Sequence, residues 1–313
     1  MLNLFPMNKI SNELANIDSI VDLIGETPMI RLSGFEGLSA DKKIYIKAEW
    51  FNPGGSIKDR AALSMIENGI KDKKLNYKKT IMDSSSGNTA IAYAMIGSAL
   101  GFKVELVTPE NINIERKKTL EAYGAKIIFS SPFEGSDGAI LEARKLAKKY
   151  SDKYFMPDQY NNPSNPLAHY NTTGPEIWEQ MNGDITHLVA GIGTSGTVTG
   201  TSKFLKEKNP DIKVIAVQPD NSLHGLEGLK HIPTSIIPGI YTDDCIDLTY
   251  WANTEKSYEI MEDLVKLEGM FVGHSGGAVV LAALEELKKT EIANIVCVIP
   301  DGGYRYLSGG VWW

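Results

Sequence analysis

The sequence predicts an α/β fold built on parallel-rich sheets that helices cover on both faces. Strand-like and helix-like segments alternate along most of the 313 residues, a pattern typical of parallel strands joined by crossover helices. Three loops rich in glycine and serine each precede a helix-like segment. Because ligands of such folds bind at the carboxyl ends of the strands, these loops are the first candidates for a site.

The N-terminal half alternates regularly. Strand-like segments cover residues 44–48, 80–83, 103–108 and 126–129, and helices are expected at 61–66, 89–100, 114–123 and 138–150. The second of these helices is rich in Ala, Ile and Met, which predicts burial, whereas the fourth is charged and amphipathic. Gly101 and Gly124 follow the second and third helices, as glycines that end helices do.

The C-terminal half repeats the pattern. It has strand-like segments at 186–190, 213–217 and 292–299, and helices are expected at 197–208, 257–269 and 277–289. Between the halves, the stretch from Met156 to Thr173 breaks the alternation, and its Asn-Pro dipeptides predict loops and turns. We therefore expect two α/β domains, residues 1–155 and 156–313, with the first ~50 residues able to pack on the C-terminal domain.

The composition indicates a soluble globular protein. Hydrophobic residues make up 42% and charged residues 23%, and the net charge of −7 gives no basic footprint for nucleic acid or acidic membranes. Cys245 and Cys297 lie far apart, and the five histidines show no ligand spacing, so we expect no disulfide framework and no metal site. The segment Met1–Met7 lacks the pattern of a signal peptide, which predicts a cytoplasmic location.

The stretch Asn52–Arg60 places Lys58 in a glycine-rich loop at the start of a helical pattern. A lysine held and desolvated at such a turn suits an amine that forms a Schiff base with a carbonyl cofactor. The alternative is a solvated lysine beside a turn.

The loop Gly191–Thr197 follows an apolar strand and opens a helix, which is the context of a phosphate cradle. Its spacing also fits a dinucleotide fingerprint, so an NAD-dependent dehydrogenase is an alternative, although the acid expected after the next strand is displaced to Asp220. A purely structural turn is the third interpretation.

Two further loops offer hydrogen-bond donors. Ser84–Thr89 can bind a carboxylate or merely cap its helix, and Gly273–Gly277 offers Ser275 as a specific donor. A Schiff-base lysine, a phosphate cradle and a carboxylate cradle together suit pyridoxal 5'-phosphate with an amino-acid substrate.

With these motifs the chain resembles the cysteine synthases (O-acetylserine sulfhydrylases), and most closely their B-type branch, among the fold-type II pyridoxal-phosphate enzymes. The resemblance extends from Ile24 to Ser308, and Asn52–Arg60 matches the family motif N-P-x-G-S-[VI]-K-D-R. It implies the two-domain, tryptophan synthase β-like fold with the active site between the domains.

The resemblance also assigns the site residues. It implies that Lys58 forms the Schiff base and acts as general base, that Asn88 bonds the ring oxygen, and that Ser275 meets the pyridine nitrogen. The substrate carboxylate is expected at Ser85, Ser86, Gly87, Asn88, Thr89 and Gln159, and the phosphate at Gly193, Thr194, Ser195, Gly196 and Thr197.

The expected reaction is β-replacement on O-acetyl-L-serine by sulfide, which gives L-cysteine and acetate through an α-aminoacrylate. The alternatives are release of hydrogen sulfide from L-cysteine with serine or a thioether as product, O-phosphoserine as donor, and a non-catalytic binding protein. Asp243 and Asp244 belong either to a solvated loop or to a site that activates water. The resemblance implies a homodimer, and the sequence does not determine whether a serine acetyltransferase binds it.

Overall fold

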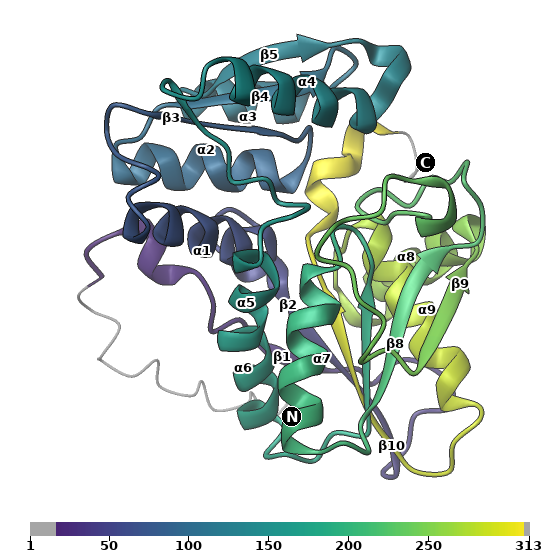
Figure 1. The fold of residues 1–313 in the computed structure, drawn as a ribbon. Helices are drawn as coiled ribbons and strands as arrows, with labels where there is room; N and C mark the ends of the chain where they lie inside the picture. The colour runs from purple at the N-terminus through teal and green to yellow at the C-terminus, as the bar shows by residue number, and fades with distance from the viewer. Residues whose placement is uncertain (1–16, 310–313) are drawn as a thin grey trace, which may run out of the picture.

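The computed structural model describes residues 17–309. The segment Met1–Met7, for which the sequence predicts no signal peptide, lies outside the described residues. Between residues 17 and 309, no helix has the length and apolar character that a membrane crossing requires. The described chain forms one sheet of six strands and one of four, with helices on both faces, which confirms the predicted α/β class (Figure 1).

The larger sheet is built from both ends of the chain. Its strands run in the order β1-β2-β10-β7-β8-β9, and every neighbouring pair is parallel except β1 and β2. The bounds are β1 (Met29–Arg31), β2 (Lys42–Ala48), β7 (His187–Gly191), β8 (Lys213–Pro219), β9 (Leu248–Ala252) and β10 (Ala293–Ile299). Since β2 pairs with β10, the segment that leads to Lys58 starts from the sheet of the C-terminal half.

The smaller sheet is entirely parallel, in the order β5-β4-β3-β6. Its strands are β3 (Thr80–Ser84), β4 (Val104–Pro109), β5 (Lys126–Ser130) and β6 (Tyr154–Phe155). The predicted division into domains at residue 155 remains our proposal.

Helices separate and cover the two sheets. The α-helices are α1 (Lys58–Lys71), α2 (Asn88–Leu100), α3 (Ile114–Ala122), α4 (Gly135–Lys149), α5 (Ser164–Asn171), α6 (Thr173–Gln180), α7 (Gly196–Lys208), α8 (Thr254–Glu268) and α9 (His274–Leu287). Short 3-10 helices are η2 (Ile20–Leu23), η3 (Glu49–Phe51), η4 (Pro132–Glu134), η5 (Ile232–Thr234) and η6 (Gly303–Gly309).

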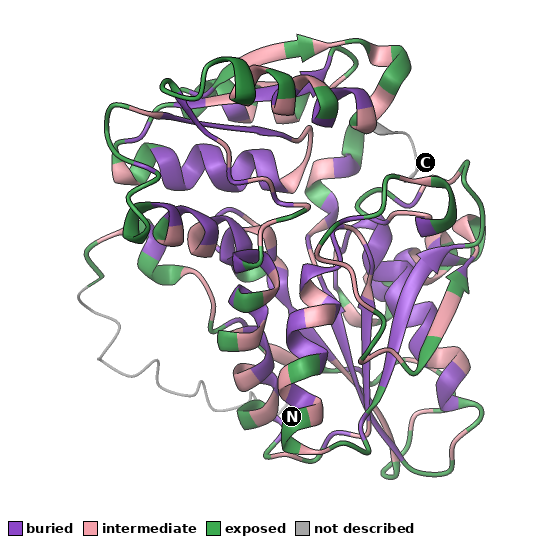
Figure 2. Cartoon of the chain, viewed as in Figure 1, coloured by how far each residue is buried: buried purple, intermediate pink, exposed green. Residues whose placement is uncertain are grey.

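Alternate residues of the central strands enter different cores. In β7, Val189 packs in the core that α8 and α9 cover, whereas Leu188 and Ala190 pack in the core that α7 covers. In β3, Ile81 and Met82 likewise face opposite cores. The strands at the centre of Figure 2 are accordingly buried on both faces, as parallel strands between helical layers are.

The prediction of loops from Met156 to Thr173 is wrong in part, because this stretch contains α5. Pro163 and Pro166 stand at or within the first turn of the helix, where a missing N–H costs no intrahelical hydrogen bond. Oδ1 of Asn162 accepts from the backbone N of Ser164 at 2.9 Å and satisfies one of the free donors there. The sequence analysis also missed β1, β6 and β9.

Candidate active site

The predicted loops converge on a cavity of about 440 Å³. Among the predicted residues, its wall includes Lys58, Ser85, Ser86, Gly87, Asn88, Thr89, Gln159, Gly193 and Thr194. A smaller adjoining cavity of about 40 Å³ shares Lys58, Asn88 and Gly193 with it, and adds Thr197 and Ser275. Ser195 and Gly196 complete the turn between Thr194 and Thr197.

Lys58 begins α1 at the end of the glycine-rich loop. Gly55 has φ +77°, a left-handed conformation that glycine adopts without steric cost. The backbone N of Ile57 then donates to the carbonyl of Pro300 at 2.9 Å, which anchors the loop to the end of β10. Burial lowers the pKa of the Lys58 amine, and the charge of Asp301 acts in the opposite direction. A lowered pKa increases the fraction of free amine, the form that attacks a carbonyl.

The loop Ser84–Thr89 joins β3 to α2, and Gln159 holds it in place. Oγ1 of Thr89 donates to Oε1 of Gln159 at 2.8 Å, and Nε2 of Gln159 donates to the carbonyl of Ser84 at 3.1 Å. Below the loop, burial raises the pKa of Asp83 to about 7. Because Gln159 bonds both ends of the loop, the hydroxyl and backbone donors of the loop are held in place at the cavity.

The turn Gly193–Thr197 joins β7 to α7. Ser195 has φ +75°, which is strained for a residue with a side chain. It is 2% exposed, and its Oγ has no hydrogen-bond partner among the described residues. A buried hydroxyl without a partner at a helix N-terminus suits an anionic ligand. The dinucleotide alternative lacks its acid, since Asp220 is exposed and accepts from Nδ2 of Asn253 at 3.1 Å.

Ser275 lies in the first turn of α9 and is 2% exposed. Its neighbour His274 is also buried, and its ring centroid lies 4.4 Å from that of Tyr306 and 5.2 Å from that of Tyr258. Burial lowers the pKa of His274. His274 thus packs as a neutral aromatic ring, while Ser275 faces the cavity.

Asp243 and Asp244 lie outside the cavity wall. Both are exposed, and the backbone N of Asp244 donates to Oγ1 of Thr242 at 3.2 Å within the same loop. Neither residue lines the cavities that hold Lys58. This placement fits the solvated-loop interpretation rather than water activation.

Two ion pairs lie at the cavity, and the sequence analysis found neither. Arg116 on α3 pairs with Glu227 at 2.7 Å, and Lys230 pairs with Asp137 on α4 at 3.4 Å. All four residues line the cavity. In each pair one partner comes from the smaller-sheet side and the other from the loop after β8, so the two pairs join the sides of the cavity.

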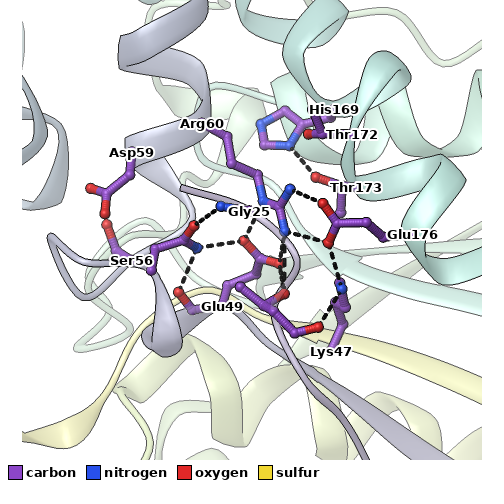
Figure 3. A network of polar contacts seen from close by, with 12 residues as sticks. Gly25, Lys47, Glu49, Ser56, Asp59, Arg60, His169, Thr172, Thr173 and Glu176 are labelled. Carbon is purple, nitrogen blue, oxygen red and sulfur yellow. Dashed lines mark hydrogen bonds and ion pairs between the residues drawn. The ribbon is translucent and has the colours of Figure 1, made fainter. Parts of the chain in front are cut away.

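A network of largely buried charges surrounds Arg60, two residues after Lys58 in the sequence (Figure 3). Nε of Arg60 donates to Oε2 of Glu49 at 2.7 Å, and its Nη2 donates to Oε2 of Glu176 at 2.7 Å. Lys47 donates to the same oxygen of Glu176 at 2.7 Å. Burial alone would raise the pKa of Glu176, but Arg60 and Lys47 lower it to about 2. The network ties α1, two residues after Lys58, to β2 and α6.

The residues of the cavity fit pyridoxal phosphate. Lys58 offers an amine of lowered pKa, the turn at Ser195 offers a buried hydroxyl without a partner, and Ser275 offers a neutral hydroxyl. Donors at the starts of α2 and α7 add backbone N–H groups for a carboxylate and a phosphate.

Comparisons with known proteins indicate the same cofactor. Residues 20–301 match the family model described as "Pyridoxal-phosphate dependent enzyme". The chain is 49% identical over 297 residues to a cysteine synthase of Aquifex aeolicus, covering 93% of this chain and 91% of the relative.

Two solved structures are also similar. A cysteine synthase of Entamoeba histolytica has a TM-score of 0.90 and 34% identity, over 100% of this chain and 94% of that chain. A hydrogen sulfide-producing enzyme of Fusobacterium nucleatum has a TM-score of 0.87 and 35% identity, over 93% of this chain and 100% of that chain.

Proposed function

The chain belongs to the cysteine synthase family of pyridoxal-phosphate-dependent enzymes, and on that premise we propose that it makes L-cysteine from O-acetyl-L-serine and sulfide. In this reaction the bond from Cβ to the acetate oxygen breaks and a bond from Cβ to sulfur forms. The observation that carries the proposal is the cavity that joins Lys58 to the loop Ser85–Thr89 and to the turn after β7.

We assign the following roles to the chain's own residues. The bound cofactor supplies an electron sink that makes the Cα proton of the amino acid acidic. Gly193–Thr197 would hold its phosphate, Ser275 would meet its ring nitrogen, and Lys58 would be its covalent attachment point. Because Ser275 is neutral, it does not favour protonation of that nitrogen as a carboxylate would.

Lys58 is also the general base of the proposal. Its lowered pKa leaves the amine free to take the Cα proton and to return it after sulfur has added. The loop Ser85–Thr89 and Gln159 hold the substrate carboxylate, which directs Cα–H at Lys58. The Arg116–Glu227 and Lys230–Asp137 pairs hold the sides of the cavity together and limit the entry of water.

The direct test is turnover by the purified protein loaded with pyridoxal phosphate. We expect cysteine and acetate to appear in equal amounts from O-acetyl-L-serine and sulfide, measured by chromatography. O-Phospho-L-serine and L-serine, offered separately, identify the preferred donor. Retention of the cofactor without cysteine from O-acetyl-L-serine would overturn the proposed activity.

Ser86→Ala should weaken binding of the amino acid and leave binding of the cofactor unchanged. Ser86 lines the large cavity but not the small one that holds Ser275 and Thr197. Loss of one hydrogen bond to a carboxylate raises KM for O-acetyl-L-serine roughly 10-fold. Steady-state kinetics and a titration of the apoprotein with cofactor separate the two effects. Loss of cofactor affinity would show that the loop has another role.

A second function, release of hydrogen sulfide from L-cysteine, is favoured by the similarity to the Fusobacterium nucleatum enzyme. The same residues would act on Cα–H of cysteine. The Cβ–S bond would break with release of hydrogen sulfide, and a bond from Cβ to the oxygen of water, or to the sulfur of a thiol, would form to give L-serine or a thioether. We expect sulfide to be detectable when cysteine is supplied alone.

Asp243→Asn and Asp244→Asn separate the two roles of the acidic loop. Because both residues are exposed outside the cavity, we expect each variant to give the same yield of serine per sulfide as the parent. Amino-acid analysis of the products measures this ratio. A fall of about 10-fold in either variant would instead show that the carboxylate activates water.

We also propose a cytoplasmic location, as the sequence predicts, and a homodimer, as the resemblance implies. Sedimentation of the loaded enzyme tests the dimer directly. Co-sedimentation with a serine acetyltransferase would decide whether the two proteins bind, which the sequence does not determine.

A further inference from the structure

The reaction proposed above gives no role to Asp301, a buried carboxylate of the site. Asp301 follows β10 at the carboxyl edge of the larger sheet and is 1% exposed. It lines the small cavity together with Lys58 and Ser275. Its Oδ1 has no hydrogen-bond partner among the described residues. Burying a charge this deeply costs free energy unless other groups pair with it and donate hydrogen bonds to it.

Asp301 and Arg305 hold the amide of Asn88 from opposite ends. Nδ2 of Asn88 donates to Oδ2 of Asp301 at 2.6 Å, and Oδ1 of Asn88 accepts from the guanidinium of Arg305. A carboxylate only accepts and a guanidinium only donates, so these two partners fix which end of the amide is nitrogen. Asp301 accepts a hydrogen bond from one of the two N–H groups on that nitrogen. The second N–H can donate to a ligand in the cavities, both of which Asn88 lines.

Asp301 and Arg305 each have a further close neighbour. The hydroxyl of Tyr306 donates to the same oxygen of Asp301, and a Cβ on Gly273 would collide with the other oxygen. A Cβ on Gly55 would lie 2.7 Å from Nη2 of Arg305. The contacts with Asp301 and Arg305 therefore set the direction of the Asn88 amide before any ligand binds.

We propose that Asp301 is a positioning residue, which turns the Asn88 amide so that its second N–H meets the ring of pyridoxal phosphate. The placement of the ring rests on the proposed function. Asp301 acts through Asn88 and bears a charge that also faces Lys58, whose amine pKa it raises against the effect of burial.

A double-mutant cycle tests this role. Asp301→Asn keeps the shape of the side chain but can offer N–H as well as oxygen, so the direction of the Asn88 amide is then fixed by Arg305 alone. We expect the Kd of pyridoxal phosphate for the apoprotein to rise about 10-fold, and the visible absorption band of the bound cofactor to shift. In an Asn88→Ala background the same substitution should change Kd by less than about twofold.

Glu286→Gln is the matched control, because Glu286 is a buried carboxylate of α9 that lines neither cavity. It should leave Kd unchanged. An unchanged Kd in Asp301→Asn, or equal rises in both backgrounds, would overturn the proposal. If Asp301→Asn does not fold by circular dichroism, Asp301→Ser in the same cycle decides by the same criteria. Failure of the proposed activity would look different, since the parent protein would bind cofactor normally but form no cysteine.

Discussion

Replacing Lys58 with alanine should abolish covalent attachment of the cofactor and nearly all cysteine formation. The substitution removes both the amine that bonds the cofactor and the base that takes the Cα proton. Loss of a general base alone lowers kcat by roughly 10²–10⁴-fold. Borohydride treatment of the parent followed by peptide mass analysis should find the cofactor on Lys58, and initial rates give the fall in kcat.

Lys71→Ala is the control, because Lys71 lies on the same helix, α1, and is exposed. This variant should keep both the adduct and the rate. A small primary amine added to Lys58→Ala should restore part of the proton transfer, because removal of the buried Lys58 side chain leaves a space that the amine can fill. An adduct on another lysine of the parent would contradict the assignment.

Much of the site could be predicted because its residues lie in loops that follow parallel strands. The loop after β3 and the turn after β7 are placed by strand order alone, and both reach the cavity as expected. The position of Lys58 in the site depends on one more feature, the pairing of β2 with β10 in the larger sheet. No local pattern shows that pairing, and it is what brings α1 against the end of β10.

The residues that the sequence analysis missed depend on long-range contacts. Arg116 stands in an ordinary charged helix, and its partner Glu227 lies 111 positions further along the chain. Asp301 contacts Asn88 across 213 positions. Charged side chains of this kind resemble solvated surface residues until the two sides of the cavity are placed together. Short elements were missed for another reason. The strand β6, for example, has two residues, which are too few to show an alternation of apolar and polar side chains.

Arg60→Met should be the most destabilising of the substitutions considered. It leaves Glu49, whose side chain is 0% exposed, with hydrogen bonds from Thr27 and Asn52 but without its cation. Removing one partner of a buried ion pair typically costs about 3–5 kcal/mol, because the other charge stays buried. Urea unfolding followed by circular dichroism measures the loss in the free energy of unfolding.

The effect of Arg60→Met should depend on pH. The pKa of Glu176 is lowered to about 2 in the folded protein, so its contribution to stability is present above its ordinary value of 4.5 and is lost as the pH falls towards 2. Arg60 is one of the two cations responsible. The difference in stability between the parent and Arg60→Met should therefore narrow as the pH falls from 5 to about 2.

The cause of the destabilisation can be isolated with a second substitution. In Arg60→Met/Glu49→Gln the buried charge is gone, so the double variant should regain at least ~2 kcal/mol over Arg60→Met alone. Lys74→Met is the matched control, because Lys74 and Asp72 form an exposed pair at 2.9 Å, whose loss should cost about 1 kcal/mol or less. If Glu49→Gln gave no recovery, the cost would come from lost packing of the Arg60 side chain rather than from an unpaired carboxylate. The packing of the Arg60 side chain, and not its charge, would then stabilise the start of α1 and hold Lys58 in position.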